Sequence, residues 1–225
     1  MTSKPQQQSR LQTTAVSAAD ITSEYGPFPG FDRIHGVTFD GRQVWAATGE
    51  ALVAFDPSNG AVSRTLDAPS DAGTAFDGKH LYQIAESRID KIDPSTGRVL
   101  HSIPAPADRG SNSGLTWAEG SLWVGQYRDR RILQIDPADG RVLRTIVSDR
   151  FVTGVTWAND ELWHGTWENE QSELRQVDPT SSEVLKRVQM PDGVVVSGLE
   201  YDGHGTFYCG GATSGKVRAV RYPKA

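Results

Sequence analysis

The chain has 225 residues, a formal net charge of −5 and no block of Lys or Arg, so we expect it to bind neither nucleic acid nor an anionic membrane. Its single cysteine, Cys209, excludes an intramolecular disulfide, and no stretch approaches the ~18 apolar residues of a membrane span. The 23 glycines and six tryptophans favour short strands and turns over helices. These features predict a globular, cytoplasmic protein.

The chain begins with a polar segment. Residues 1–9, MTSKPQQQS, are predicted to form a disordered tail. The first twenty residues lack the continuous apolar run of a signal peptide.

A hairpin sequence then recurs five times, in repeats that start near residues 34, 71, 112, 152 and 196. The copies are HGVTFDGRQVWAA, AGTAFDGKHLYQI, SGLTWAEGSLWVG, TGVTWANDELWHG and SGLEYDGHGTFYCG. Apolar and polar residues alternate around a turn that contains Gly, Asn or Asp, which indicates two paired antiparallel strands. The leading glycines are Gly36, Gly73, Gly114, Gly154 and Gly198.

Further strand-like segments follow each hairpin. A third segment, such as ALVAFDP or RIDKIDP, occurs in all five repeats, and a fourth, such as AVSRTL or RVLHSI, occurs in the first four. Four strands per unit and a period of about forty residues predict an all-β, five-bladed β-propeller with four-stranded antiparallel blades. Because the fifth repeat ends after its third strand, we expect residues 10–16, RLQTTAV, to supply its outer strand and close the ring. Residues 10–225 then form one domain.

The second strands of the repeats align on an aromatic residue that is expected to pack between blades. The next position differs in each repeat, and such variation on a constant scaffold is expected where a ligand binds. We therefore predict that this position reaches one mouth of the central channel and that His164 and Cys209, in neighbouring blades, lie close together. The five residues at this position are Ala46, Gln83, Val124, His164 and Cys209.

The same mouth is expected to receive the start of each inner strand and the loop after each second strand. Of the five histidines, His35 and His164 are predicted to reach it, because the other three lie in opposite turns or on an outer strand. A polar loop residue is often merely exposed, and a partly buried histidine often only satisfies a hydrogen bond. The other candidates at the mouth are Arg33, Glu50, Asp71, Glu86, Asn112, Tyr127, Thr153 and Trp167.

The segments DGRQVW, LYQI, GLTW, ANDELW and IDPADGRV resemble the five-bladed glutaminyl cyclases of plants and bacteria, and more distantly the streptogramin (virginiamycin B) lyases. The resemblance spans most of the chain from Gly36 onward. It implies a substrate role for Gln83 and Trp167, which match the family's strands, but Ala46 stands where the family has its acid/base glutamate. A methyl group transfers no proton, so glutaminyl cyclisation is not expected unless Glu86 or His35 replaces that base.

Two functions follow from these residues. The first is an enzyme of lyase, cyclase or hydrolase type that acts on a small molecule, with His164 or His35 as base and Glu86 as its acid or orienting group. A Cys209–His164 nucleophile pair is a variant of this hypothesis. The alternative is a non-catalytic module that recognises a metabolite or a protein partner.

No cofactor is predicted from a motif. A glycine-rich phosphate loop and a Gly-x-Ser-x-Gly motif are both absent. The resemblance to the lyases, which use histidine and glutamate with a magnesium ion, leaves a divalent cation open. However, the sequence contains no spaced set of metal ligands, and we assign no residue to a metal.

Overall fold

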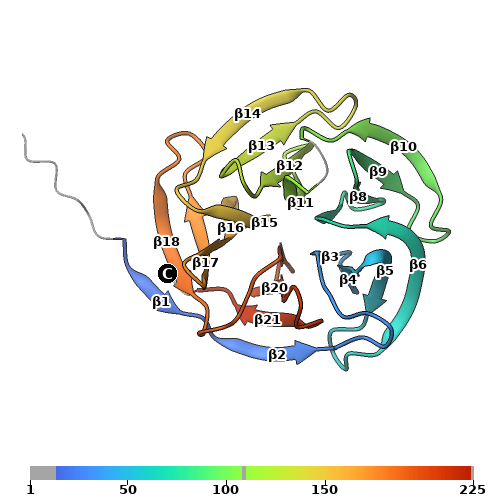
Figure 1. Cartoon of the computed structure of the whole chain (residues 1–225), viewed down its shortest axis with the longest axis horizontal. Helices are drawn as coiled ribbons and strands as arrows, with labels where there is room; N and C mark the ends of the chain where they lie inside the picture. Colours follow the sequence, from blue (N-terminus) through green and yellow to red (C-terminus); the bar gives the residue numbers. More distant parts are fainter. Residues whose placement is uncertain (1–13, 108–109, 224–225) are drawn as a thin grey trace, which may run out of the picture.

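The computed structural model describes residues 14–107 and 110–223, in which five β-sheets surround a central axis as the blades of a propeller (Figure 1). The predicted fold class is confirmed. No helix in these residues is long and apolar enough to cross a membrane. Blade 1 contains β3 (Gly36–Phe39), β4 (Val44–Ala47), β5 (Gly49–Phe55) and β6 (Val62–Ser70).

The other blades repeat this order from the axis outward. Blade 2 contains β7 (Thr74–Phe76), β8 (Leu81–Ala85), β9 (Arg88–Ile92) and β10 (Val99–Pro104). Blade 3 contains β11 (Asn112–Ala118), β12 (Ser121–Gln126), β13 (Arg131–Ile135) and β14 (Val142–Val147). Blade 4 contains β15 (Phe151–Ala158), β16 (Glu161–Glu168), β17 (Gln171–Val177) and β18 (Val184–Gln189).

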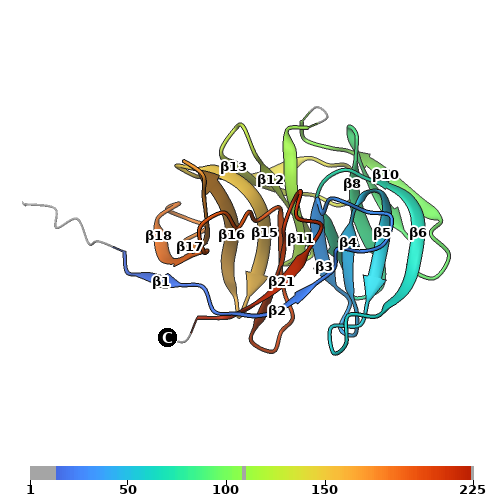
Figure 2. The ribbon, with the colours of Figure 1, turned by 60° about the horizontal axis from the view of Figure 1, so that its bottom comes forward.

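Blade 5 is built from both parts of the chain. Its strands are β19 (Gly198–Tyr201), β20 (Thr206–Gly210), β21 (Val217–Arg221) and β2 (Ile21–Tyr25). β2 pairs antiparallel with β21, so an N-terminal strand closes the ring as predicted (Figure 2).

The predicted range of this closing strand, residues 10–16, is wrong. Residues 10–13, like the predicted tail at 1–9, lie outside the described part of the chain. Val16 belongs instead to β1 (Val16–Ala18), which pairs in parallel with β18 and adds a fifth strand to blade 4. The physical reason is burial: Ile21 and Tyr25 pack against two hydrophobic clusters between blades, whereas 48% of Val16 is exposed. The residues of β1 are exposed, so this strand lacks an apolar face that could pack in blade 5.

Aromatic residues of the second strands pack between blades, as predicted. Each of the five is at most 5% exposed. The Tyr82 ring stacks on Trp117 of the next blade at 5.4 Å, and the Trp123 ring meets Trp157 of the next blade at 5.1 Å. Such contacts bury large aromatic surfaces at each interface and fix the angle between neighbouring blades.

The five leading glycines explain how the inner strands converge on the axis. A Cβ atom on Gly73 would lie 2.3 Å from the backbone nitrogen of Leu115, and one on Gly198 would lie 2.7 Å from the Cα atom of Gly36. The equivalent glycines of the other blades meet the next blade at similarly short distances. Only a residue without a side chain allows this approach. We call these five residues the glycine ring; it narrows the channel and separates its two ends.

Candidate active site at the channel mouth

One mouth of the channel holds a cavity of about 420 Å³ that receives residues from all five blades. We call it the mouth pocket. Arg33 and His35 precede β3, Asn112 begins β11, and Tyr127 and Trp167 lie at the ends of the second strands of blades 3 and 4. All five were candidates from the sequence, and so were Asp71 and Thr153, which also line the pocket.

Aromatic rings form one wall of the mouth pocket. The Tyr127 ring stacks on Phe151 at 4.7 Å with an interplanar angle of 17°, and Phe151 is the cross-strand partner of Trp167. Within the described residues, neither the Tyr127 hydroxyl nor the Trp167 indole N–H has a hydrogen-bond partner. The wall therefore retains two donors for a ligand.

Polar groups at the base of the pocket join blades to one another. The Ser113 hydroxyl donates to the Val152 carbonyl in the next blade at 2.7 Å, and the Ser197 hydroxyl donates to the Ile34 carbonyl at 2.5 Å. The Asn112 side chain donates to the Ala107 carbonyl at 2.9 Å. These three side chains are thus occupied by structural hydrogen bonds, whereas the buried Thr153 hydroxyl has no partner among the described residues.

His35 is the pocket group best suited to move a proton. Its backbone N–H donates to the Ala47 carbonyl at 2.7 Å, which anchors the residue to blade 1. Burial and the neighbouring Arg33 lower the pKa of the imidazole, against the opposite effect of Asp71 and Asp32. The ring is therefore neutral near pH 7 and able to accept a proton. Arg33 is exposed and forms no ion pair with a described residue.

A second hollow of about 650 Å³ adjoins the mouth pocket and shares Arg33 and His35 with it. Glu50, predicted at the mouth, lies here together with Asp32 and Thr48. His35 thus stands between a pocket with an aromatic wall and a more acidic, open surface.

His164 does not reach the mouth, contrary to the prediction. Only 1% of the residue is exposed, and neither pocket includes it. Side chains alternate along β16, so His164 lies on the same face as Leu162, which packs toward blade 3. Burial and the nearby Arg175 lower the pKa of His164 to about 4. The positions next to the second-strand aromatics are buried in all five blades, because they face a neighbouring blade and not the channel.

The proposed pairing of Cys209 with His164 is also wrong. Cys209 is 1% exposed and packs with Trp163 in the cluster between blades 4 and 5. His164 occupies the opposite face of β16, so the sheet of blade 4 separates the two side chains. Burial raises the pKa of the Cys209 thiol to about 12, which disfavours the reactive thiolate.

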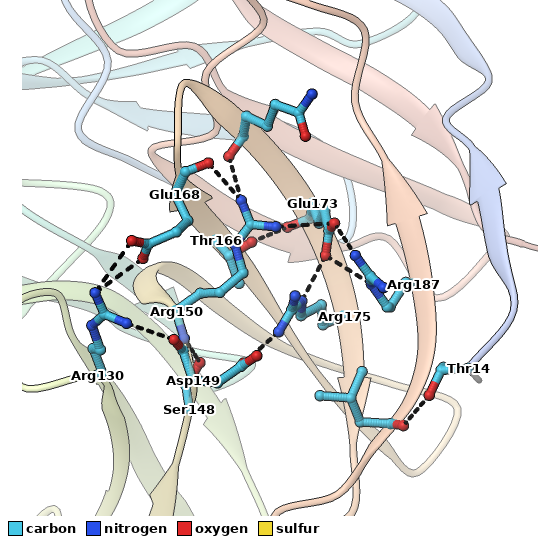
Figure 3. A network of polar contacts seen from close by, with 12 residues as sticks. Thr14, Arg130, Ser148, Asp149, Arg150, Thr166, Glu168, Glu173, Arg175 and Arg187 are labelled. Atoms are coloured by element: carbon cyan, nitrogen blue, oxygen red, sulfur yellow. Dashed lines mark hydrogen bonds and ion pairs between the residues drawn. The ribbon is translucent and has the colours of Figure 1, made fainter. Parts of the chain in front are cut away.

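Arg175, the cross-strand partner of His164, belongs to a structural network of charges (Figure 3). The carboxylate of Glu173 accepts hydrogen bonds from Arg175 Nε at 2.7 Å and from Arg187, and it forms an ion pair with Arg150, whose Nη1 lies 3.0 Å away. Burial alone would raise the pKa of Glu173, but hydrogen bonds from Arg187 and Arg175 outweigh this and hold it at about 2. These contacts tie β17 and β18 to the connection that precedes β15.

The two remaining candidates support the pocket from outside. Glu86 lies in an exposed turn with φ of 57°; its carboxylate pairs with Arg88 at 3.3 Å, while its backbone N–H donates to Asp71 at 3.1 Å. Gln83 is fully buried and donates to the Ala72 and Ile84 carbonyls at 3.1 and 2.7 Å. Neither side chain lines the mouth pocket, so their predicted catalytic and substrate roles find no geometric support.

Sequence reasoning missed Glu200, on the far side of the glycine ring. It accepts hydrogen bonds from Thr38 Oγ1 at 2.8 Å and from Thr156 Oγ1 at 2.7 Å. Alignment of the five repeats could have identified Glu200. Two positions after each leading glycine, the residues are Thr38, Ala75, Thr116, Thr156 and Glu200, of which one alone is charged.

The described residues contain no group of three or more His, Cys, Asp or Glu side chains that suits a metal ion. No family model matches the chain, and no curated protein matches its sequence. The glutaminyl cyclase of Myxococcus xanthus is similar in structure, with a TM-score of 0.75 and 15% identity over 92% of this chain and 97% of that chain. The β-propeller domain of Cps50 (Swd1) from Myceliophteria thermophila has a TM-score of 0.60 and 10% identity, over 91% of this chain and 100% of that chain.

These similarities concern the fold alone. The resemblance to five-bladed glutaminyl cyclases is confirmed as a structural one. At such low identity it carries no activity over to this chain. Ala46, which the resemblance implied to stand in the place of that family's glutamate, is fully buried and does not line the pocket.

Proposed function

We propose that the mouth pocket binds a small organic molecule and that His35 acts on it as a general base. The observation that carries this proposal is the position of a neutral imidazole in a cavity to which all five blades contribute. An imidazole in this state removes a proton from a substrate and returns it later in the cycle. Elimination, cyclisation and hydrolysis all need such a step.

The surrounding residues have separate roles in this proposal. Tyr127 and Trp167 stack on a planar or apolar part of the substrate, and their free donors orient it. Arg33, which has no ion pair within the described residues, attracts an anionic group or stabilises negative charge that develops during the reaction.

The substrate is expected to differ from that of the glutaminyl cyclases. A protein of similar fold carries that name, but this chain has a buried methyl group at the position of the family's glutamate. Glu86, the other candidate for a relocated base, is turned toward Arg88. His35 is left as the base, and it lies just before β3, not on the second strand that carries Ala46.

One observation favours a non-catalytic module as the second candidate. The hydroxyls of Ser113 and Ser197 are already used to join blades, which leaves an aromatic wall and one guanidinium as the main recognition groups. Such a surface is sufficient to bind a metabolite or a protein partner without turnover. A cytoplasmic location stays a prediction.

The test is a thermal-shift screen of small metabolites, including peptides with N-terminal glutamine, each with and without a divalent metal, followed by product analysis of the compounds that bind. A ligand at a hundred times its dissociation constant stabilises the folded state by about 2.7 kcal/mol. Trp167→Ala is expected to abolish the shift. His35→Ala is expected to keep most of the binding and to lose turnover by about 10²-fold or more.

His101→Ala is the matched control, because His101 is exposed on an outer strand. It should behave as wild type in both assays. Binding that is lost in Trp167→Ala, without turnover in wild type, supports the non-catalytic module. If no compound shifts the wild-type protein, the small-molecule site is refuted.

A further inference from the structure

Glu200 is the only acidic or basic residue on the five inner strands, β3, β7, β11, β15 and β19. It lies two residues beyond Gly198, whereas Ser197 of the mouth pocket lies one residue before it. Because the glycine ring separates them, Glu200 belongs to the other half of the channel and takes no part in the proposed reaction.

Hydrogen bonds at Glu200 join three blades. Thr38 of blade 1 donates to one carboxyl oxygen at 2.8 Å. The other oxygen accepts from Thr156 of blade 4 at 2.7 Å and from the backbone N–H of Tyr201 at 2.9 Å. Blade 5 is the blade that closes the ring, so these contacts fasten the closing blade to both of its neighbours.

The carboxyl group has no compensating positive charge. Among the residues that the structure describes, no ion pair involves Glu200, and β3, β7, β11 and β15 contain no Lys, Arg or His. The titratable groups nearest in the sheet are two tyrosines: Tyr201, which follows Glu200, and Tyr208, its cross-strand partner. Burial raises the pKa of Tyr208, so it stays neutral. A buried carboxylate without a counter-charge is costly, and a proton removes that cost.

Water has access to this site. Glu200 retains partial exposure although it is surrounded by protein. The Thr116 hydroxyl, at the equivalent position of blade 3, has no hydrogen-bond partner in the described residues, although the residue is only 2% exposed. A proton therefore has a route to the carboxyl group and a polar lining to receive it.

We propose that Glu200 is a proton-binding switch in the channel: protonated, it fastens blade 5 to blades 1 and 4, and its ionisation weakens the closure of the ring. Burial, opposed by the hydrogen bonds from Thr156, Tyr201 and Thr38, raises the pKa of Glu200 to about 7 from 4.5. Because the folded-state pKa is raised, the bound proton contributes its full stabilisation below about pH 4.5. This stabilisation is lost as the pH rises through about 7.

The test compares urea unfolding of wild type and Glu200→Gln at pH 5, 6, 7 and 8. Gln has a similar shape but no charge, so the variant lacks this titration. Relative to the variant, the unfolding equilibrium constant of wild type should increase between pH 5 and pH 7 by up to about tenfold per pH unit. The difference between the two proteins is the readout. The lowered pKa values of His35 and His164 make the free energy of unfolding rise with pH in wild type and variant alike, which is opposite to the effect of Glu200.

Glu161→Gln is the matched control. Glu161 accepts hydrogen bonds from Trp163, Lys186 and Tyr222. Burial alone would raise the pKa of Glu161, but these hydrogen bonds outweigh burial and lower the pKa. Its substitution should therefore shift stability by the same amount at every pH from 5 to 8.

Two results would overturn the proposal. One is a difference between wild type and Glu200→Gln that stays constant from pH 5 to 8. The other comes from the wild-type protein alone, so it does not depend on whether the variant folds: a Glu200 carboxyl carbon that titrates near 4.5 by NMR, or that titrates there only after sodium or calcium chloride is added. The latter result would indicate a cation in place of the proton.

Discussion

Glu173 and Glu200 are both enclosed by protein, yet their surroundings shift the pKa of the two carboxyl groups in opposite directions. Glu173 in blade 4 is contacted by three arginines, which hold its pKa at about 2 (Figure 3). Glu200 on the inner strand β19 accepts hydrogen bonds from two hydroxyls and one N–H, with no ion pair among the described residues, and its pKa is raised to about 7. Hydrogen bonds alone do not offset the burial of this charge, whereas three guanidinium groups do.

The difference separates a structural carboxylate from a titratable one. Glu173 stays ionised at any physiological pH and holds the strands of blade 4 in place. Glu200 changes charge near neutrality and lies where the ring closes. The mouth pocket differs from both, because the Arg33 guanidinium at its edge is exposed.

The largest effect is expected for Glu173→Gln. Removal of the carboxylate leaves Arg150, Arg175 and Arg187 without their common partner, and breaking a buried pair of this kind costs about 3–5 kcal/mol. Urea unfolding at pH 7 measures the cost. Since the folded-state pKa is lowered, the wild-type contribution is present above about 4.5 and is lost as the pH falls toward 2. An exposed control, Glu183→Gln, should change the free energy of unfolding by no more than about 0.5 kcal/mol. Equal effects of the two substitutions would contradict the structural role of Glu173.

An intermediate effect is expected for Thr156→Val, which removes one donor from Glu200. The loss should destabilise the protein by about 1–3 kcal/mol at pH 8, where the carboxyl group is ionised, and by less at pH 5. Thr116→Val is the control, because its hydroxyl occupies the same position of another blade without a partner. If Thr116→Val costs as much as Thr156→Val, the hydrogen bond to Glu200 is not what stabilises the ring.

The smallest effect on stability is expected for His35→Ala. The side chain is partly exposed and none of its ring atoms is needed to join two blades. The free energy of unfolding should therefore change by less than about 1 kcal/mol. Denaturant unfolding without ligand measures this. A loss of several kcal/mol would assign His35 to the scaffold, and a concurrent loss of turnover would then carry no mechanistic meaning.

The repeat made most of the architecture predictable, but the closing strand was assigned to the wrong residues. Alternation alone does not distinguish residues 10–16 from Ile21–Tyr25, since both contain apolar side chains at strand spacing. The choice depends on which segment covers the edge of β21, and that is a contact between the two ends of the chain.

The candidate site was predictable where it depends on strand ends. Residues that enter the inner strands or leave the second strands, such as Arg33, Asn112 and Trp167, do meet at one mouth. His164 and Cys209 were misplaced because variation among repeats was taken to indicate a ligand, when it reflects different packing at each interface between blades. Glu200 was visible as the one charged residue at an aligned position that otherwise holds threonine or alanine, but its importance depends on contacts with Thr38 and Thr156 in two other repeats.

The sequence by itself determined the all-β class, the number of blades and the positions of the glycine ring, because these follow from local periodicity and from spacings that recur. The tertiary structure alone decided which side chains face the channel, which face a neighbouring blade and which carboxyl group lacks a counter-charge. Those properties depend on contacts between residues far apart in the chain, where burial and partner charge set the energy of each group.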